Sequence, residues 1–402
     1  MGKTKKTSKL AKAKFKKPKA TSKVVDAFMQ LVRGFSYQQP SLARLRRLTH
    51  FTFWAGAGFS KSWDPKAPIG SELFRLDSKV IERVADTAVL HRMFGLDAFE
   101  GITPDQLRQI VYQIDMFERY PDVRSRYVDA QNLSIFRAAL RAAVVDRYEK
   151  ITRLNYFHKS ALKFPLSNPT HSQRDIVAFF RYLLEQTDGS QESVQGIRTH
   201  FVTTNYDYVI ETILDNMLAP DDSLFLYTYR GFTPAEVVQQ TNTTPVHQHW
   251  LTWHLLKING GFEILRGSDG YVLDYSCRSP DVIMRDPPVL MLASREQDYS
   301  DPYFKAIFPK AVRLMRETQV LVLVGYSLPQ DDALIRIILR QFAEEPEDGL
   351  GKAIFYIGPS PDHEKLAAIR EVFPATVFDQ VLHVFTYQGG FDAFAAECLS
   401  CL

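Results

Sequence analysis

Apolar residues recur along the chain with two different periods, and these periods predict its elements. Residues 24–34 carry apolar side chains at helical spacing (Val25, Phe28, Met29, Leu31 and Val32), which predicts a first amphipathic helix. Residues 50–54 form a short apolar run that ends at a glycine-rich segment, which predicts a buried strand. The chain therefore changes early from a helical to a strand pattern.

From residue 71 to about residue 195 the helical period dominates. Apolar residues recur at i, i+3 and i+4 within residues 82–94, 104–117, 134–148 and 174–186. Pro121, Pro165 and Pro169 separate these segments. We expect a mostly helical insertion between the first and second strands.

The second half alternates between strand-like and helix-like segments. Short apolar runs rich in Val and Ile occupy residues 200–203, 289–292, 320–324, 353–357 and 382–385, and amphipathic stretches occupy residues 208–217, 302–317, 333–344 and 361–372. Such alternation favours a parallel sheet covered on both faces. The predicted fold is therefore α/β, a Rossmann-like parallel sheet with helices on both faces and an inserted helical subdomain. The predicted division is a disordered tail (1–23), a sheet domain (24–70 with 196–402) and the insertion (71–195).

Composition is that of a globular protein. Of the 402 residues, 45% are hydrophobic and 24% charged, and no run of 18 apolar residues predicts a membrane span. The three cysteines are too few for a secreted disulfide framework, which favours a cytoplasmic location. Cys398 and Cys401 form a Cys-x-x-Cys pair without two further ligands, so we expect two thiols on a terminal helix and no metal.

The net charge of +3 hides an uneven distribution. Residues 1–25 contain ten lysines and no acidic residue, so the rest of the chain carries a charge near −7. The tail lacks the apolar core of a signal peptide and the arginines of a mitochondrial transit peptide. Two interpretations stay open: a solvated, disordered arm, or an arm that contacts nucleic acid or an acidic partner.

Three short polar or glycine-rich segments follow predicted strands. The first, residues 55–60, reads Ala-Gly-Ala-Gly-Phe-Ser, in which Gly56 and Gly58 lack the Cβ atoms that would obstruct a pyrophosphate. Ser60 and the amides near Ala57 offer hydrogen bonds to phosphate oxygens. A tight turn without a ligand is the alternative. No acidic residue that reads a ribose is evident about twenty residues later, which argues against an ordinary dehydrogenase.

The second segment, residues 203–207, reads Thr-Thr-Asn-Tyr-Asp and ends a predicted strand. Asn205 would face the crevice in which open α/β sheets bind ligands, where an amide can hold a ribose hydroxyl or a water. Asp207 is also a favoured type of helix cap. The third segment holds Gly325 and Ser327. Gly325 would allow a ligand to approach the backbone closely, and the Ser327 hydroxyl could contact a phosphate or the ribose. Asp331 and Asp332 after it predict a capped helix.

Together, the Gly-Ala-Gly-x-Ser, Thr-Thr-Asn-Tyr-Asp and Val-Gly-Tyr-Ser-Leu-Pro segments resemble the bacterial sirtuin-like family, across about residues 45–390. The resemblance implies an NAD-hydrolysing effector of anti-phage defence. It also implies that Gly56, Gly58 and Ser60 form the phosphate loop and that Asn205 is the catalytic asparagine. Asp207 and Ser327 would line the same pocket. A protein-deacylating sirtuin is a poorer match, because its zinc ribbon needs four cysteines.

The chain departs from the family at Asn259. Residues 257–261 read Lys-Ile-Asn-Gly-Gly, where the family has a histidine before the glycine. An asparagine forms hydrogen bonds but exchanges no protons near neutral pH. The chain is then a natural variant with altered chemistry, an inactivated form, or one in which His247, His249 or His254 substitutes.

The leading hypothesis is an NAD+ hydrolase that releases nicotinamide and ADP-ribose and depletes NAD in defence, with Asn205 and Asn259 as catalytic residues and NAD as the substrate. The alternatives are a non-catalytic binder of NAD or ADP-ribose and a nucleic-acid-associated scaffold. The resemblance further implies self-assembly into a homo-oligomer and control by a partner such as a hexameric DNA-translocating ATPase.

Overall fold

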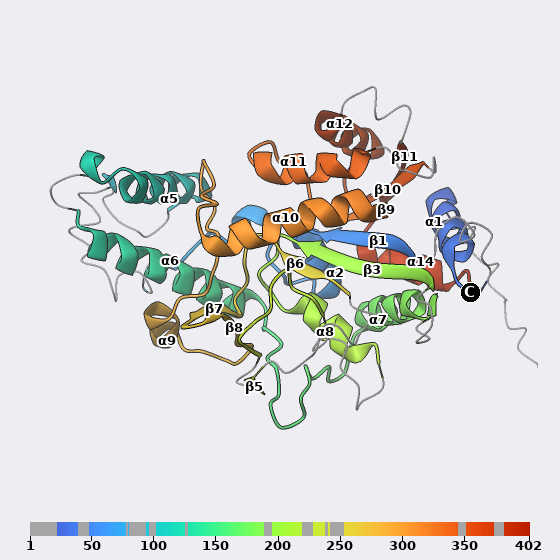
Figure 1. Ribbon diagram of the computed structural model, residues 1–402, viewed down its shortest axis with the longest axis horizontal. Helices are drawn as coiled ribbons and strands as arrows, with labels where there is room; N and C mark the ends of the chain where they lie inside the picture. The colour runs from blue at the N-terminus through green and yellow to red at the C-terminus, as the bar shows by residue number, and fades with distance from the viewer. Residues whose placement is uncertain are drawn as a thin grey trace, which may run out of the picture.

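The computed structural model describes residues 22–38, 48–77, 79, 94–95, 102–124, 128–188, 195–218, 228–237, 240–241, 253–344, 351–373 and 382–402. Residues 1–21 of the lysine-rich tail, residues 82–93 of one predicted helix, and His247 and His249 lie outside the described residues. A mainly parallel sheet runs through the centre of the molecule (Figure 1).

The central sheet has the doubly wound strand order. Its parallel strands are β1 (Leu48–Ala55), β3 (Gln195–Thr203), β6 (Leu255–Lys257), β9 (Thr318–Val324), β10 (Lys352–Gly358) and β11 (Leu382–Gln388). They lie in the order β11-β10-β9-β1-β3, with β6 beside the carboxyl end of β3 and the short antiparallel β2 (Thr187–Asp188) beside its amino end. The chain thus starts in the middle, builds towards β6, returns, and builds towards β11. This is the Rossmann arrangement, and it confirms the predicted fold class.

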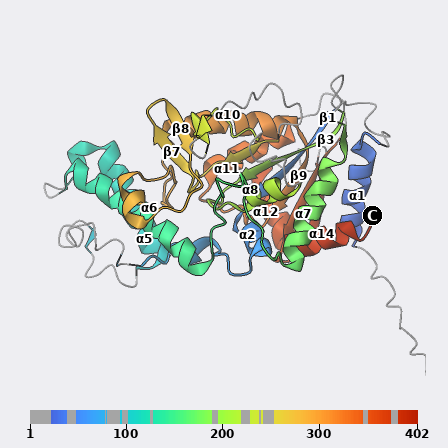
Figure 2. The same ribbon diagram turned by 90° about the horizontal axis from the view of Figure 1, so that it is seen from below.

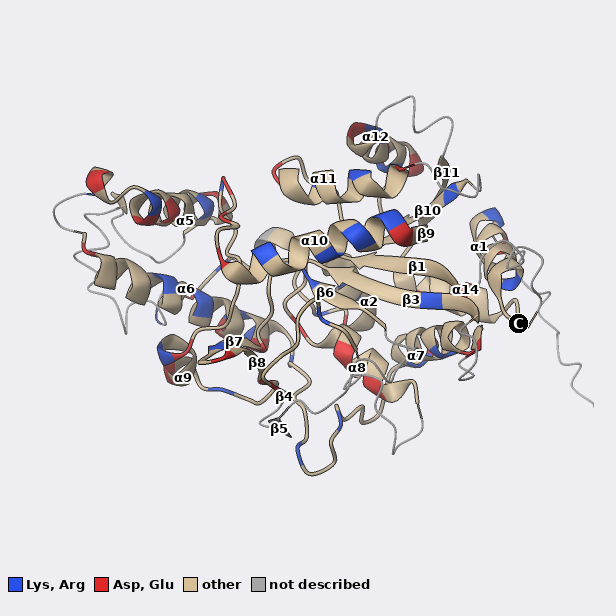
Figure 3. Cartoon of the chain, viewed as in Figure 1, with Lys and Arg blue, Asp and Glu red and all other residues tan. Residues whose placement is uncertain are grey.

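Burial explains why the strands were readable from the sequence. Every residue of β9 is buried, and so is every residue of β10. Figure 3 shows that the strands of the sheet are largely free of charged residues, which lie mainly on helices and loops. Strands covered on both faces must be apolar throughout, so they appear as continuous hydrophobic runs.

Helices cover both faces of the sheet. On one face α1 (Lys23–Phe35), α7 (His171–Leu184) and α14 (Phe391–Leu399) pack together, and Phe28, Phe179 and Phe394 make edge and stacked ring contacts between them. On the other face lie α10 (Pro302–Glu317), α11 (Ala333–Arg340) and α12 (Asp362–Val372) (Figures 1 and 2). The predicted helices at residues 24–34, 302–317 and 361–372 are therefore confirmed.

A helical group lies beyond one end of the sheet. It contains α5 (Pro104–Arg119), α6 (Ala130–Ile151) and α9 (Pro280–Arg285) (Figure 1). Arg137 on α6 connects this helix to α5 by ion pairs with Asp115 at 2.8 Å and Glu118 at 2.7 Å. α7 falls within residues 71–195 but packs against α14 and β3. The division into a sheet domain and an insertion at residues 71 and 195 stays a proposal.

Two features of the second half differ from the sequence prediction. A small separate sheet, in the order β5-β4-β8-β7, is formed by Gln240–Thr241, Glu236–Val237, Gly270–Leu273 and Ile264–Gly267. Its strands have two to four residues, too few for a period to be recognised. The strand predicted at residues 289–292 is wrong: this run is buried but irregular and makes one bridge, between Leu290 and Gly260. In the described part of the chain, no helix combines the length and apolar character needed to span a bilayer.

Candidate functional site

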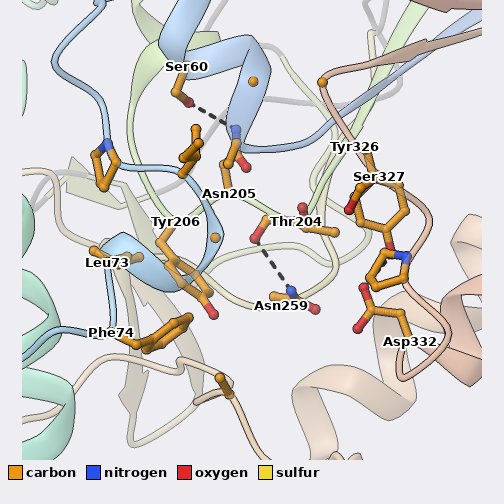
Figure 4. A pocket seen from close by; sticks show the side chains of 18 of the residues that line it. Ser60, Leu73, Phe74, Thr204, Asn205, Tyr206, Asn259, Tyr326, Ser327 and Asp332 are labelled. Atoms are coloured by element: carbon orange, nitrogen blue, oxygen red, sulfur yellow. Dashed lines mark hydrogen bonds between the residues drawn. The ribbon is translucent and has the colours of Figure 1, made fainter. Parts of the chain in front are cut away.

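The carboxyl ends of the parallel strands open into one large cavity. Its volume is about 570 Å³, within the range of small-molecule sites. Residues that follow β1, β3, β6, β9 and β10 line it, together with the 3-10 turn Gly70–Glu72 and side chains from α5 and α6. Figure 4 shows Asn205 and Asn259 on the same cavity, with Tyr326, Ser327 and Asp332 across from them. Ligands of open α/β sheets bind at this position.

The first segment, residues 55–60, and the third, which holds Gly325, meet backbone to backbone. A Cβ on Gly58 would lie 2.6 Å from the Cα of Gly325, and a Cβ on Gly56 would lie 2.6 Å from the Gly325 carbonyl oxygen. The Gly58 amide donates to that oxygen at 3.0 Å, and the backbone of Gly325 has a positive φ of 57°. The glycines therefore allow the end of β9 to pack on the start of α2 (Ala57–Trp63). This contact, rather than a ligand alone, requires that side chains be absent.

Asn205 has a fixed orientation. Its Nδ2 donates to the carbonyl oxygen of Gly56 at 2.8 Å and to Ser60 Oγ at 2.9 Å. The Ser60 hydroxyl in turn donates to Asp207 Oδ2 at 2.5 Å, so it must accept from Asn205. These partners assign the amide nitrogen unambiguously, because a carbonyl oxygen can only accept. Among the described residues no hydrogen bond occupies Asn205 Oδ1, which is the atom left for a ligand.

Asp207 anchors this chain of hydrogen bonds. Its Oδ1 accepts from the Val209 amide at 3.1 Å, at the start of α8 (Val209–Asn216), and its Oδ2 also accepts from the Tyr148 hydroxyl at 3.0 Å. Burial, and next the charge of Asp207, hold the pKa of Tyr148 well above its ordinary value, so the phenol stays a donor. Asp207 thus precedes Tyr208, the N-cap of α8, binds the first amide of that helix, and forms a buried part of the cavity wall.

Asn259 lies on the turn after β6. Its Nδ2 is 3.5 Å from the carbonyl oxygen of Thr204, a weak contact, and its Oδ1 is buried without a hydrogen-bond partner among the described residues. A buried polar atom without a partner is costly unless a ligand or water meets it. Asn259 therefore has hydrogen-bonding capacity that its neighbours in the described structure do not use.

The opposite wall carries a carboxylate. Asp332 was predicted as a helix cap, but its side chain makes no capping hydrogen bond to α11. Instead it accepts from the Tyr326 hydroxyl and, at 3.0 Å, from Gln297 Nε2. Burial raises the pKa of Asp332 above its ordinary value. Asp332 therefore occupies the predicted N-cap position of α11, but its side chain does not cap the helix because Tyr326 and Gln297 bind its oxygens.

The structure brings the predicted site residues together. Gly56 packs behind the cavity, and the others line it: Ala57, Gly58, Ser60, Asn205, Asp207, Asn259, Gly325 and Ser327. Two groups stand out among the lining residues that sequence reasoning missed. The Gly358-Pro359-Ser360 loop could have been found, because it follows a predicted strand. Arg108 and Tyr148 come from helices remote in sequence, and no local signal marks them.

His254 does not replace the missing histidine. It lies at the start of β6, with its ring 4.5 Å from that of His200, whose Nε2 is 2.8 Å from His50 Nδ1. Burial lowers the pKa of His254 to about 3 and that of His200 well below its ordinary value. The three imidazoles form a cluster away from the cavity lining, in which His200 and His254 stay neutral. Elsewhere in the described chain, no group of three or more His, Cys, Asp or Glu side chains is arranged to hold a metal ion.

Comparison with known proteins points to one family. Residues 199–373 match the family model of the SIR2-like domain. This range contains Asn205, Asn259 and Gly325 but not the glycine segment after β1. A structure of Sir2 enzymes aligns with 94% of this chain and 96% of its own, at 12% identity and a TM-score of 0.39. A Sir2 structure with a p53 peptide and NAD+ aligns over 88% and 92%, at 11% identity and a TM-score of 0.35. Comparison with curated proteins gave no match.

Residues 199–373 are therefore similar to the SIR2-like domain. The assignment of the fold rests on the strand order of the central sheet.

Proposed function

We propose that the protein is an NAD+ hydrolase that cleaves the bond between nicotinamide and ribose and releases ADP-ribose. The observation that carries the proposal is the fixed carboxamide of Asn205 at the carboxyl end of a central strand. Its nitrogen is bound to Gly56 and Ser60, and its oxygen has no protein partner among the described residues. Such an oxygen suits a neutral site that must hold a ribose hydroxyl or an attacking water.

The chemistry requires few charged groups. Loss of nicotinamide passes through an oxocarbenium-like state, as glycoside hydrolysis does, and the pyridine leaves neutral without being protonated. Fixed dipoles and a fixed geometry then supply most of the acceleration. The Asn205 oxygen would face the developing positive charge with its negative end. Asp207, which is bound to Ser60, Tyr148 and the Val209 amide, would keep Asn205 from turning.

The cavity also suits the rest of the dinucleotide. It extends from the Asn205 wall to the loops after β9 and β10, as an extended ligand in a Rossmann crevice requires. Its lining is mostly apolar towards Leu73 and Phe74 and polar near Ser327 and Ser360. We place nicotinamide and its ribose near Asn205 and Asn259, and adenosine near the β9 and β10 loops.

A non-catalytic binder of NAD or ADP-ribose is the second candidate. It is favoured by Asn259, which offers hydrogen bonds but no proton exchange near neutral pH. No histidine is among the described residues that line the cavity. A binder would keep the site closed around its ligand without releasing nicotinamide.

The resemblance to the defence family also suggests a cellular role for NAD hydrolysis. Depletion of NAD would serve anti-phage defence, with self-assembly and an ATPase partner as possible means of control. The ten lysines of the N-terminal tail add a proposed electrostatic contact with nucleic acid. These roles stay predictions.

The test measures nicotinamide release from NAD by the purified protein and by Asn205→Ala. We expect release by the starting protein and a loss of about 10²-fold or more in Asn205→Ala, since positioned dipoles contribute on this order. Asn216→Ala is the matched control, because Asn216 is also part-buried and binds two backbone carbonyls outside the cavity. Tight ADP-ribose binding without any nicotinamide release would instead establish the binder.

A further inference from the structure

A buried ammonium group lies behind the Asn205 wall and has no place in the chemistry described above. Lys257, the last residue of β6, has its Nζ 2.7 Å from Glu211 Oε1 and 3.0 Å from Glu263 Oε1. The lysine side chain is 4% exposed, and the two carboxylate side chains are 0% and 2% exposed. The same Nζ donates to the carbonyl oxygen of Asp207 at 2.7 Å.

Stability alone is a weak reason for such a cluster. Moving charges out of water is costly, and apolar residues of similar volume often stabilise a core as well as a buried ion pair does. The aromatic surroundings could accept such a replacement: the Tyr208 ring lies 5.3 Å from Nζ. Although burial acts to lower it, the charges of Glu211 and Glu263 raise the pKa of Lys257, so the ammonium persists. The cluster therefore calls for a role that a neutral side chain lacks.

The position of Lys257 suggests that role. Residues 203–207, which carry Asn205, lie beside residues 257–263, which carry Asn259. The Ile258 amide donates to the Thr203 carbonyl at 3.0 Å, and the Phe262 amide donates to the Tyr206 carbonyl at 3.2 Å. Lys257 adds a hydrogen bond from its ammonium in the second segment to the backbone carbonyl of Asp207 in the first, and an ion pair to α8 through Glu211.

The Lys257 turn is itself held from the other side. The Tyr303 hydroxyl on α10 donates to the Lys257 carbonyl oxygen at 2.7 Å. Glu263, at the far end of the second segment, binds the same ammonium through both of its oxygens. The Lys257 ammonium thus connects the start of the turn that presents Asn259 to its end at Glu263. Through the Asp207 carbonyl it also holds the segment that presents Asn205.

We propose that Lys257 is a positioning residue that holds the Asn205 and Asn259 segments in one fixed arrangement. Its effect on turnover rests on the proposed hydrolase function, whereas its effect on the two segments does not. A shift of about 1 Å in a reacting group can lower a rate about 10²-fold, so a lysine that never touches the substrate can still control kcat.

The first experiment is amide hydrogen exchange on the unliganded protein, comparing Lys257→Met with the starting protein. We expect exchange in residues 203–211 and 257–263 to become about tenfold faster, while peptides from β9 keep their rate. Lys352→Met is the matched control. Lys352 is 2% exposed, and its Nζ donates to the Arg316 carbonyl at 2.8 Å, but it starts β10 at the end of the sheet away from the cavity. Unchanged exchange in both segments, or equal acceleration in β9, would overturn the proposal.

The second experiment separates kcat from KM for nicotinamide release. Lys257→Met should lower kcat about 10²-fold per folded molecule, with KM within about threefold, and Lys352→Met should leave both unchanged. Tyr303→Phe removes the hydrogen bond to Lys257 without removing a charge, and should change exchange and kcat in the same direction by less. It serves where Lys257→Met fails to fold. An unchanged kcat in Lys257→Met and Tyr303→Phe would refute the inference. A starting protein without turnover, but with the exchange effect intact, would refute only the hydrolase function.

Discussion

Asn259 presents a carboxamide where a proton-exchanging side chain would act on the ribose. Within the part of the chain that the structure describes, its buried Oδ1 has no hydrogen-bond partner, so the side chain can form a further interaction. We predict that Asn259→His raises nicotinamide release by about 10²–10⁴-fold, the contribution of a positioned acid or base. An imidazole with a pKa near its ordinary value of about 6.5 could both orient the ribose and exchange protons. Steady-state nicotinamide release from NAD measures the gain.

The double variant Asn205→Ala with Asn259→His is the control for this prediction. It should lose the gain, because the histidine would act on a ribose that Asn205 no longer orients. A folded, NAD-binding Asn259→His protein that remains as slow as the starting protein would contradict the assignment of Asn259 to the ribose wall.

Single residues of the site differ in how far the sequence could reveal them. Asn205 and Asp207 were identified because both follow an apolar strand directly. Tyr148 is one aromatic residue in a helix of apolar periodicity, and its contact with Asp207 spans 59 positions. Lys257 would be expected on a surface, since lysine is rarely buried. Only the fold brings Glu211 and Glu263 to it, so no local pattern predicts the cluster.

At the scale of elements, the junction of α2 with the end of β9 depends on missing side chains. A Cβ on Gly58 would lie 2.6 Å from the Gly325 Cα, and backbone atoms cannot move aside as a flexible side chain can. We predict that Gly58→Ala destabilises the protein by about 1–3 kcal/mol, the usual range for overpacking. Urea denaturation measures the change.

Gly358→Ala is the matched control for the junction. It lies at the end of the neighbouring strand β10, and its added Cβ would meet only Tyr356 Cε2 at 3.9 Å, an ordinary contact. Its stability should stay within about 0.5 kcal/mol of the starting protein. Equal stability of Gly58→Ala and Gly358→Ala would show that the α2 and β9 segments separate easily.

The large elements were predictable because burial on both faces gives a continuous apolar run, as in β9, and burial on one face gives a helical period, as in α10. The same rule failed at residues 289–292, where an apolar run is buried beside Gly260 and makes an isolated bridge instead of a strand ladder. It also gave no signal for β6, whose three residues pair with the end of β3. Pairing depends on neighbours distant in sequence, which the period of a short segment does not report.

At the scale of the whole molecule, two buried clusters make the free energy of unfolding depend on pH in opposite directions. One contains His200 and His254, and the other contains Glu263 beside Lys257. Burial holds the pKa of His254 at about 3, against 6.5 ordinarily, and holds that of His200 low as well. Their stabilising contribution is complete above pH 6.5 and is lost as the pH falls towards 3, because only the unfolded chain takes up the protons. Burial raises the pKa of Glu263 from 4.5 to about 7. Its contribution is complete below pH 4.5 and is lost as the pH rises through 7.

We therefore predict that in Glu263→Gln, where the titration of Glu263 is removed, the free energy of unfolding falls steadily as the pH decreases below 6.5. Each histidine that stays neutral in the fold adds a slope of up to about 1.4 kcal/mol per pH unit. Adding His254→Phe should reduce that slope by about one proton, because a phenyl ring keeps the packing against His200 and takes up no proton. Urea denaturation between pH 4 and pH 8 measures the slopes, and His363→Gln, at an exposed position on α12, should leave them unchanged. An undiminished slope after His254→Phe is added to Glu263→Gln would show that His254 is not a source of the acid sensitivity.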